Sequence, residues 1–196
     1  MSSKAKKLKR GFYLRPTLEV ARDLIGKYLV CRTGGRLLSA RLVEVEAYIG
    51  EDDPACHAAV GRTPRNEVMY GPGGFSYVYF IYGMYYCLNI VTEVKGFPAA
   101  VLIRGAEPVD GIEIMNLNYG RTRQVRLTNG PGKLCKAFNL TRKQNNLDLT
   151  GSNLYLEDRH DRAARIKSSA RIGIKKGVDK NWRFFDPDSS YVSVKR

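Results

Sequence analysis

The chain has 196 residues, with 33 Lys or Arg against 19 Asp or Glu, so its formal net charge is +14. This length predicts one compact domain with a core of ordinary size, and the charge indicates affinity for a polyanion without identifying it. No apolar run reaches transmembrane length and the N-terminal segment lacks a signal-like apolar stretch, so we expect a cytosolic protein that does not enter a membrane.

Basic residues gather at the two ends of the chain. Residues 1–10 form a lysine-rich arm that we expect to be flexible, ahead of a single domain over residues 11–196. The last third holds a second basic group: Arg159, Arg162, Arg165, Lys167, Arg171, Lys175, Lys176, Lys180 and Arg183. A run of charge is usually a solvated face, so these groups alone are weak evidence for a binding site.

The cysteines do not form a metal or disulfide pattern. They are scattered at Cys31, Cys56, Cys87 and Cys135. Only His57 and His160 could join them as zinc ligands, and neither spacing matches a zinc site. We therefore expect reduced thiols, no metal and no cofactor.

The first predicted element is a short helix that Thr17 can cap and Gly26 closes. We expect it to turn four side chains toward the core: Leu18, Ala21, Leu24 and Ile25. A strand over residues 28–32 follows.

A second strand, over residues 41–49, carries the acidic side chains of interest. Alternation predicts one core-facing set, Val43, Val45, Ala47 and Ile49, and one opposite set, Leu42, Glu44, Glu46 and Tyr48. The second face can simply be solvent-exposed, or Tyr48 and Glu46 can form the floor of a pocket beside a carboxylate. Carboxylates spaced i, i+2 lie roughly 7 Å apart, within the range used to hydrolyse glycosidic bonds, although this spacing is common by chance.

Residues 51–74 form a long polar segment broken by Pro and Gly, a kind of loop that is functional or disordered. Five tyrosines follow within Y-V-Y-F-I-Y-G-M-Y-Y-C-L-N, residues 77–89. Gly83 can take the positive φ of a tight turn, which predicts a β-hairpin with Tyr82 at its tip. Tyrosine rings in a basic chain favour stacking on nucleic-acid bases, and the alternative is an aromatic-rich β-core.

The rest of the chain completes a mixed pattern. We expect a buried strand over residues 99–104, a helix near residues 108–117, another helix after N-G-P-G at residues 129–132, and short strands with basic turns over residues 154–194. The G-P-G-K turn can present backbone N–H groups to a phosphate, although Leu134 stands where a P-loop needs Ser or Thr. The predicted fold class is α+β: a mixed, mostly antiparallel curved sheet with packed helices and a protruding hairpin.

Five blocks occur in a fixed order between about Leu42 and Ala137. They are V-E-V-E-A-Y-I-G-E-D-D-P-A-C-H, G-R-T-P-R-N, the tyrosine-rich block, A-A-V-L-I-R-G-A-E-P and N-G-P-G-K-L-C. Together with W-R-F-F and Y-V-S-V near the C-terminus, they resemble the alkyladenine (3-methyladenine) DNA glycosylase family. One departure is Gly132, where members of that family often carry Ser.

The resemblance implies a monofunctional DNA glycosylase of base excision repair. Such an enzyme flips an alkylated or deaminated purine out of double-stranded DNA and hydrolyses its N-glycosidic bond, leaving an abasic site. The motifs place no lysine as a Schiff-base nucleophile, so strand nicking is not expected. The implied partner is duplex DNA containing damaged purines, and we expect a monomer in the cytoplasm, at the nucleoid of a bacterium or in the nucleus of a eukaryote.

The resemblance also implies site residues. Glu46 is the general base that activates water, Arg104 helps to hold that water, and Tyr82 is the wedge that fills the gap in the base stack. The flipped base is held among Tyr48, His57 and Tyr79, and Asn89 excludes normal guanine. Further DNA contacts are implied for Thr63, Arg65, Met69, Gly130 and Lys133.

Two other classes of protein remain possible from the residues alone. A metal-dependent nuclease could gather four carboxylates around Mg²⁺, namely Glu44, Glu46, Asp52 and Asp53. A non-catalytic protein that binds nucleic acid would account for the positive charge and the tyrosines. It would not account for a buried-looking carboxylate beside those tyrosines.

Overall fold

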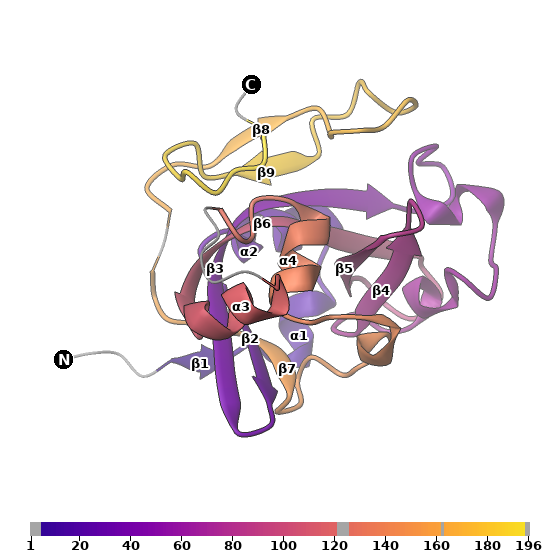
Figure 1. Cartoon of the computed structure of the whole chain (residues 1–196). Helices are drawn as coiled ribbons and strands as arrows, with labels where there is room; N and C mark the ends of the chain where they lie inside the picture. Colours follow the sequence, from indigo (N-terminus) through magenta and orange to yellow (C-terminus); the bar gives the residue numbers. More distant parts are fainter. Residues whose placement is uncertain (1–4, 121–125, 162, 195–196) are drawn as a thin grey trace.

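The computed structural model describes residues 5–120, 126–161 and 163–194, so Lys4 and Arg162 of the two basic groups lie outside the described residues. It has the predicted α+β class (Figure 1). Nine strands form one sheet in the order β1-β7-β2-β3-β6-β5-β4, with β9 paired to β3 and β8 paired to β9. Each of these pairings is antiparallel.

The strands are β1 (Lys6–Lys7), β2 (Tyr28–Thr33), β3 (Arg36–Ile49), β4 (Ser76–Ile81), β5 (Tyr85–Val91), β6 (Ala99–Asp110), β7 (Leu154–Asp158), β8 (Lys167–Ser169) and β9 (Arg183–Phe185). The helices are α1 (Arg10–Tyr13), α2 (Thr17–Leu24), α3 (Ile112–Asn118) and α4 (Pro131–Ala137), with short 3₁₀ helices η1 (His57–Val60), η2 (Glu67–Tyr70) and η3 (Arg142–Gln144). Within the described helices, none combines the length and the apolar character needed to cross a membrane.

The lysine-rich arm is partly attached to the sheet. Lys6 and Lys7 pair with Asp158 and Glu157 of β7, and Leu8 is buried in the main core. Strand pairing therefore holds the second half of the arm against the domain.

Strand β3 is the centre of the sheet, and its side chains do not follow the simple alternation. The main core contains Leu42 as well as Val45 and Ala47, so the prediction that Leu42 faces away from the core is wrong. The pairing of β3 with β6 shifts register on both sides of Glu44. Such a bulge adds one residue to a strand and changes which face the following side chains occupy.

Helix α2 also differs from its prediction. Thr17 is its first helical residue rather than its cap, and Leu18 is exposed instead of buried. The buried stripe has the i, i+3, i+4, i+7 spacing of an amphipathic helix and consists of Thr17, Val20, Ala21 and Leu24. Gly26, with φ 87°, ends the helical segment as expected.

The helix predicted near residues 108–117 begins later. Strand β6 continues through Pro108 to Asp110, and α3 starts only after Gly111 at φ 74°. A Cβ on Gly111 would lie 2.4 Å from the Leu38 side chain, so the close approach of the chain requires glycine here.

The Pro- and Gly-rich segment 51–74 is ordered by one buried amide. Asn66 Nδ2 donates to the carbonyl oxygens of His57 and Gly61, both at 2.8 Å, and its Oδ1 accepts from the Thr63 N–H at 2.7 Å. These bonds close the loop on itself and fix the backbone of His57.

The tyrosine hairpin is confirmed. Ile81 pairs with Tyr85, which leaves Tyr82, Gly83 and Met84 as the turn, and Tyr82 and Gly83 have φ values of 55° and 67°. The Tyr82 side chain is 77% exposed. A large aromatic ring thus projects from the tip of the hairpin.

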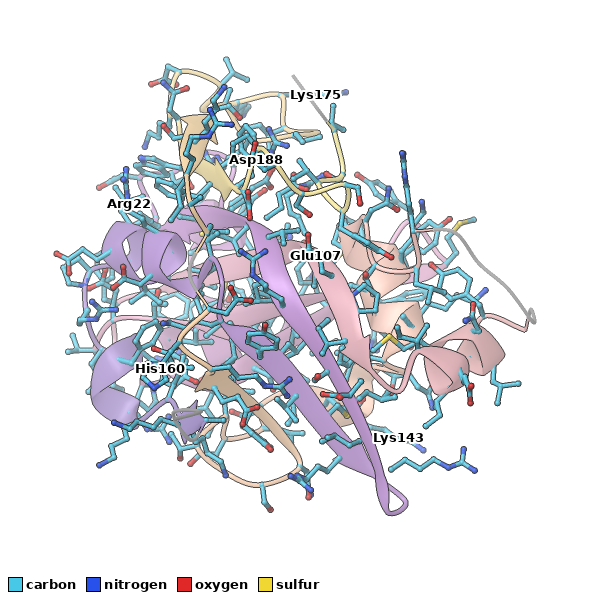
Figure 2. All side chains as sticks on the ribbon, turned by 90° about the vertical axis from the view of Figure 1, so that its left-hand side faces the viewer. Arg22, Glu107, Lys143, His160, Lys175 and Asp188 are labelled. Atoms are coloured by element: carbon cyan, nitrogen blue, oxygen red, sulfur yellow. The ribbon has the colours of Figure 1, made fainter. Side chains whose placement is uncertain are left out.

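The C-terminal strands β8 and β9 extend the sheet beside β3 and lie at the top of the view in Figure 1, and Lys175 and Asp188 lie in this region (Figure 2). Its anchor is Glu44, which is fully buried on β3. The Glu44 carboxylate accepts from Arg183 Nε at 2.7 Å and from the Ser193 N–H and Oγ at 2.5 and 2.9 Å. A charged network therefore joins the end of the chain to the centre of the sheet.

We predict that Arg183→Met lowers the free energy of unfolding by about 3–5 kcal/mol, because Glu44 would keep its buried charge with one cation fewer. Urea unfolding measures the change. Arg165→Met is the control, since the Arg165–Asp188 pair is exposed and should change the midpoint little. Equal midpoints for Arg183→Met and Arg165→Met would contradict the assigned role of Glu44.

Candidate active site

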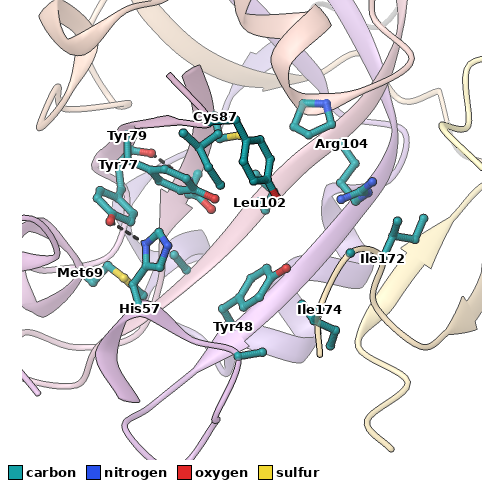
Figure 3. Close-up of a pocket in the computed structure, with 17 residues that line it drawn as sticks. Tyr48, His57, Met69, Tyr77, Tyr79, Cys87, Leu102, Arg104, Ile172 and Ile174 are labelled. Atoms are coloured by element: carbon teal, nitrogen blue, oxygen red, sulfur yellow. Dashed lines mark hydrogen bonds between the residues drawn. The ribbon is translucent and has the colours of Figure 1, made fainter. Parts of the chain in front are cut away.

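One pocket of about 320 Å³ opens where β3, the loop 51–74, the hairpin, β6 and the segment 172–174 meet (Figure 3). Seven residues with predicted site roles line it: Tyr48, His57, Met69, Tyr79, Tyr82, Asn89 and Arg104. Pro131, at the start of α4, also contributes. Segments far apart in the sequence thus converge on a single aromatic-lined cavity.

The other predicted residues lie around this pocket. Arg65 lies over the Tyr79 ring, 5.5 Å from its centroid, and Thr63 belongs to the loop organised by Asn66. Gly130 precedes α4, and the exposed Lys133 donates from Nζ to Asn129 Oδ1 at 2.8 Å. None of these four residues lines the cavity itself.

One wall of the pocket is aromatic. The rings of His57 and Tyr79 meet edge to face with centroids 4.5 Å apart, and both lie across the cavity from Ile172 and Ile174 (Figure 3). His57 Nδ1 and the Tyr77 hydroxyl form a 2.8 Å hydrogen bond, so the buried Tyr77, which also lines the pocket, fixes the orientation of the histidine. Burial, and secondarily the nearby Arg65, lower the pKa of His57 to about 4. The imidazole is therefore neutral at pH 7.

Glu46 is fully buried and touches three pocket-lining residues. Its Oε2 accepts from the Tyr48 hydroxyl at 2.9 Å and from Arg104 Nη1 at 3.3 Å, and its Oε1 accepts from the Ile172 N–H at 2.7 Å. Burial raises the pKa of Glu46 above its ordinary value, while Arg104 opposes that rise. The result is a carboxylate that is fixed in position and more basic than one in water.

The donors distinguish the two neighbouring carboxylates. Glu44 accepts from Arg104 Nε, Arg183 Nε and both donors of Ser193, and of these residues only Arg104 lines the pocket. The donors to Glu46 among the described residues are Tyr48, Arg104 and Ile172, and all three line the pocket. Glu46 is therefore the carboxylate that is bound directly to the pocket lining.

Asn89 lies on β5 opposite Tyr77. Its Nδ2 donates to the Tyr77 carbonyl oxygen at 3.1 Å, and the side chain is 4% exposed. The strand pairing therefore fixes the orientation of this amide where it borders the cavity.

The departure at Gly132 has a steric reason. A Cβ there would lie 2.8 Å from the ring of Tyr85, so glycine lets the start of α4 pack directly against the hairpin. The same contact leaves no room for a serine side chain without movement of Tyr85.

The C-terminal contribution to the site was not predicted. Ile172 donates its N–H to Glu46 across 126 positions of sequence, and Arg171 forms a fully buried ion pair with Asp53. The sequence showed only a basic turn here, and an Arg next to an Ile carries no local signal of such contacts.

The four carboxylates of the nuclease alternative do not converge. Glu44 and Glu46 bind Arg104, and Asp53 binds Arg171. In the parts of the chain that the structure describes, no group of three or more His, Cys, Asp or Glu side chains is arranged to hold a metal ion. The four cysteines are free and buried.

Comparisons with known proteins confirm the resemblance. A family model described as methylpurine-DNA glycosylase matches residues 11–190. A relative from Desulfitobacterium hafniense (strain Y51) is 48% identical over 97% of this chain and 100% of its own length, and one from Methanocella arvoryzae is 51% identical over 95% of each. A third, from Sodalis glossinidius, is 52% identical over 90% of this chain and 95% of its own. All three are named "Putative 3-methyladenine DNA glycosylase".

We predict that His57 makes the stability of the fold depend on pH. Its pKa is about 4 in the folded state and 6.5 ordinarily, so the unfolded chain takes up a proton that the folded chain excludes. As the pH falls from about 6.5 to about 4, the wild type should lose on the order of 2 kcal/mol of unfolding free energy relative to His57→Gln.

Urea unfolding at a series of pH values measures this difference. A His57→Gln curve that runs parallel to that of the wild type would refute the prediction.

Proposed function

This chain belongs to the methylpurine-DNA glycosylase family, and on that basis we propose that it flips alkylated or deaminated purines out of duplex DNA and hydrolyses their N-glycosidic bond. The products are the free base and an abasic site. The observation that carries the proposal is the buried Glu46 carboxylate, which accepts hydrogen bonds from three residues that line an aromatic pocket.

The shape and lining of the pocket support binding of a flipped base. Tyr48 lies opposite the wall of His57 and Tyr79 (Figure 3), so a flat purine can insert between aromatic groups. Base–aromatic stacking returns about 1–3 kcal/mol per base, which offsets the few kcal/mol needed to unstack a damaged nucleotide. Tyr82, exposed at the hairpin tip and bordering the pocket, would fill the gap left in the duplex.

The proposed reaction is a hydrolysis with Glu46 as general base. Glu46 accepts a proton from the attacking water, and the water oxygen forms a bond to C1′ of the sugar. The C1′–N bond breaks and its electron pair leaves with the purine. Arg104, which contacts both Glu44 and Glu46, would hold the water and the nearby DNA backbone.

Selectivity would arise from both leaving group and shape. Alkylated purines leave readily, so a positioned base, which contributes roughly 10²–10⁴-fold, can suffice. Asn89, fixed by Tyr77, would clash with the exocyclic amino group of normal guanine.

DNA contacts outside the pocket would come from its rim. Thr63 and Arg65 belong to the loop 51–74, and Gly130 and Lys133 lie at the start of α4. Met69 of the same loop is buried and lines the pocket, so its contact would be with the flipped nucleotide. Basic side chains at such positions neutralise phosphates, which agrees with the net charge of +14.

We propose that the enzyme lacks strand-nicking activity. A lyase step requires an amine that forms a Schiff base with the sugar, and no lysine lines the pocket in the described parts of the chain.

A strand-cleavage assay tests the function. The protein is incubated in EDTA with a duplex that carries a single 3-methyladenine or hypoxanthine, and half of each sample is then treated with alkali. We expect strand breaks only after alkali. Breaks before alkali would indicate a lyase, since EDTA keeps a metal-dependent nuclease inactive, and binding without breaks on any alkylated substrate would indicate a protein that is not a glycosylase.

We predict that Glu46→Gln slows base release by roughly 10²–10⁴-fold, because the amide cannot accept the proton of the attacking water. Single-turnover release gives the rate, and affinity for a duplex with a stable abasic-site analogue gives the binding. Binding should be retained. Release near the wild-type rate would show that Glu46 is not the base.

We predict that the single-turnover rate rises with pH through the pKa of Glu46. Water activation requires the ionised form, and burial raises that pKa above the ordinary value of 4.5, so the acid limb should lie above this value. The residual rate of Glu46→Gln should show no such limb. An acid limb at or below 4.5 would contradict the burial argument.

A further inference from the structure

A buried ion pair joins two segments that flank the candidate base. The Arg171 guanidinium binds the Asp53 carboxylate through two bonds, Nη1–Oδ2 at 2.5 Å and Nη2–Oδ1 at 2.7 Å, and both side chains are 0% exposed. Two parallel bonds of this kind fix the relative orientation of the partners as well as their distance. Neither residue lines the pocket.

The Asp53 end of the pair organises the loop that leads to His57. The carboxylate accepts from the backbone N–H of Ile49 at 3.3 Å and from that of Ala55 at 3.2 Å. Ala55 and His57 both line the pocket. The ion pair therefore fixes one edge of the cavity.

The Arg171 end acts on β3 and on Tyr48. Nη1 donates to the Ala47 carbonyl oxygen at 2.9 Å, and the guanidinium lies 4.7 Å from the Tyr48 ring centroid and 5.2 Å from that of Trp182. A cation over an aromatic face is attracted to it and restrains the ring. Tyr48 in turn donates its hydroxyl proton to Glu46.

The residue after Arg171 completes the arrangement. Ile172 donates its N–H to Glu46 Oε1 at 2.7 Å, and residues 172–174 form the pocket wall. Two of the three donors to Glu46, the Tyr48 hydroxyl and the Ile172 N–H, thus depend on where Arg171 is held.

We propose that Arg171 and Asp53 are a positioning pair for base release, holding the Tyr48 hydroxyl and the Ile172 N–H on Glu46. The inference rests on the proposed role of Glu46. Hydrogen bonds to the charged form of a carboxylate favour that form, so loss of the Ile172 donor disfavours ionised Glu46. Loss of position also matters, because a misplacement of about 1 Å can cost about 10²-fold in rate.

The test compares Arg171→Met, Asp53→Asn and the double variant in single-turnover base release. We expect each single change to slow release about 10–100-fold while affinity for a duplex with an abasic-site analogue changes little. The double variant should be no more than about threefold slower than the slower single variant, because both changes break the same pair. The proposal would be overturned if the double variant were slowed by the product of the two single effects. Equal losses of rate and of affinity in the single variants would also overturn it.

A second readout separates positioning from stability. In Asp53→Asn the acid limb of the rate profile should move to higher pH than in the wild type. This variant keeps the positive charge of Arg171, which itself acts on Glu46, together with Glu44, Tyr48, Cys87 and Arg104. Loss of the Asp53 charge alone would move the limb to lower pH, so a limb that is unmoved or moved to lower pH would contradict the proposal.

Arg41→Met is the matched control. Arg41 also forms part-buried ion pairs, with Glu107 and Asp186, but these lie away from the pocket. This variant should lose stability without a shift of the acid limb. An equal shift in Arg41→Met would assign the effect to general destabilisation and overturn the positioning role.

Arg171→Lys keeps the test decisive if Arg171→Met does not fold. Lysine retains the charge over Tyr48 but loses the two-bond geometry, so release should be intermediate between the wild type and Asp53→Asn. A folded Arg171→Lys with the wild-type rate and profile would refute the proposal. The wild type in the same assay distinguishes failure of the positioning role from failure of the proposed function. If the wild type releases no base, the proposed function itself is refuted.

Discussion

Two carboxylates buried side by side on β3 set the requirements for the rest of this structure. Glu44 and Glu46 are both 0% exposed, and Arg104 lies within 3.2 and 3.3 Å of them. A buried charge is costly unless cations and hydrogen-bond donors surround it. The central strand can therefore exist in this form only when other segments bring such donors to it.

The C-terminal third supplies most of those donors. Arg183 and Ser193 complete the shell of Glu44, and the Ile172 N–H reaches Glu46. The same segment provides one wall of the pocket. Folding of the sheet and assembly of the candidate site therefore depend on each other, because the segment that supplies donors to the Glu44 and Glu46 carboxylates also forms part of the pocket lining.

The differences between prediction and structure have identifiable physical causes. Alternation failed at Leu42 because of a β-bulge, which depends on how β6 pairs with β3. The exposed Leu18 and the buried Thr17 reflect packing of α2 against partners remote in sequence, among them Glu93, which accepts from the Thr17 hydroxyl. The periodicity of a short segment does not reveal which strand it pairs with or which distant residues a helix packs against.

The sequence by itself determined the family, the strand that carries Glu46 and the hairpin with Tyr82 at its tip, because those features depend on short-range patterns and ordered motifs. Only the tertiary structure decided which of the two carboxylates is bound entirely by residues of the pocket lining. Their difference depends on donors at Arg104, Ile172 and Arg183, which lie 58 to 139 positions away along the chain. Folding alone brings those donors to β3, where hydrogen-bond partners, not sequence spacing, distinguish the acid joined to the C-terminal segment from the acid bound to the pocket lining.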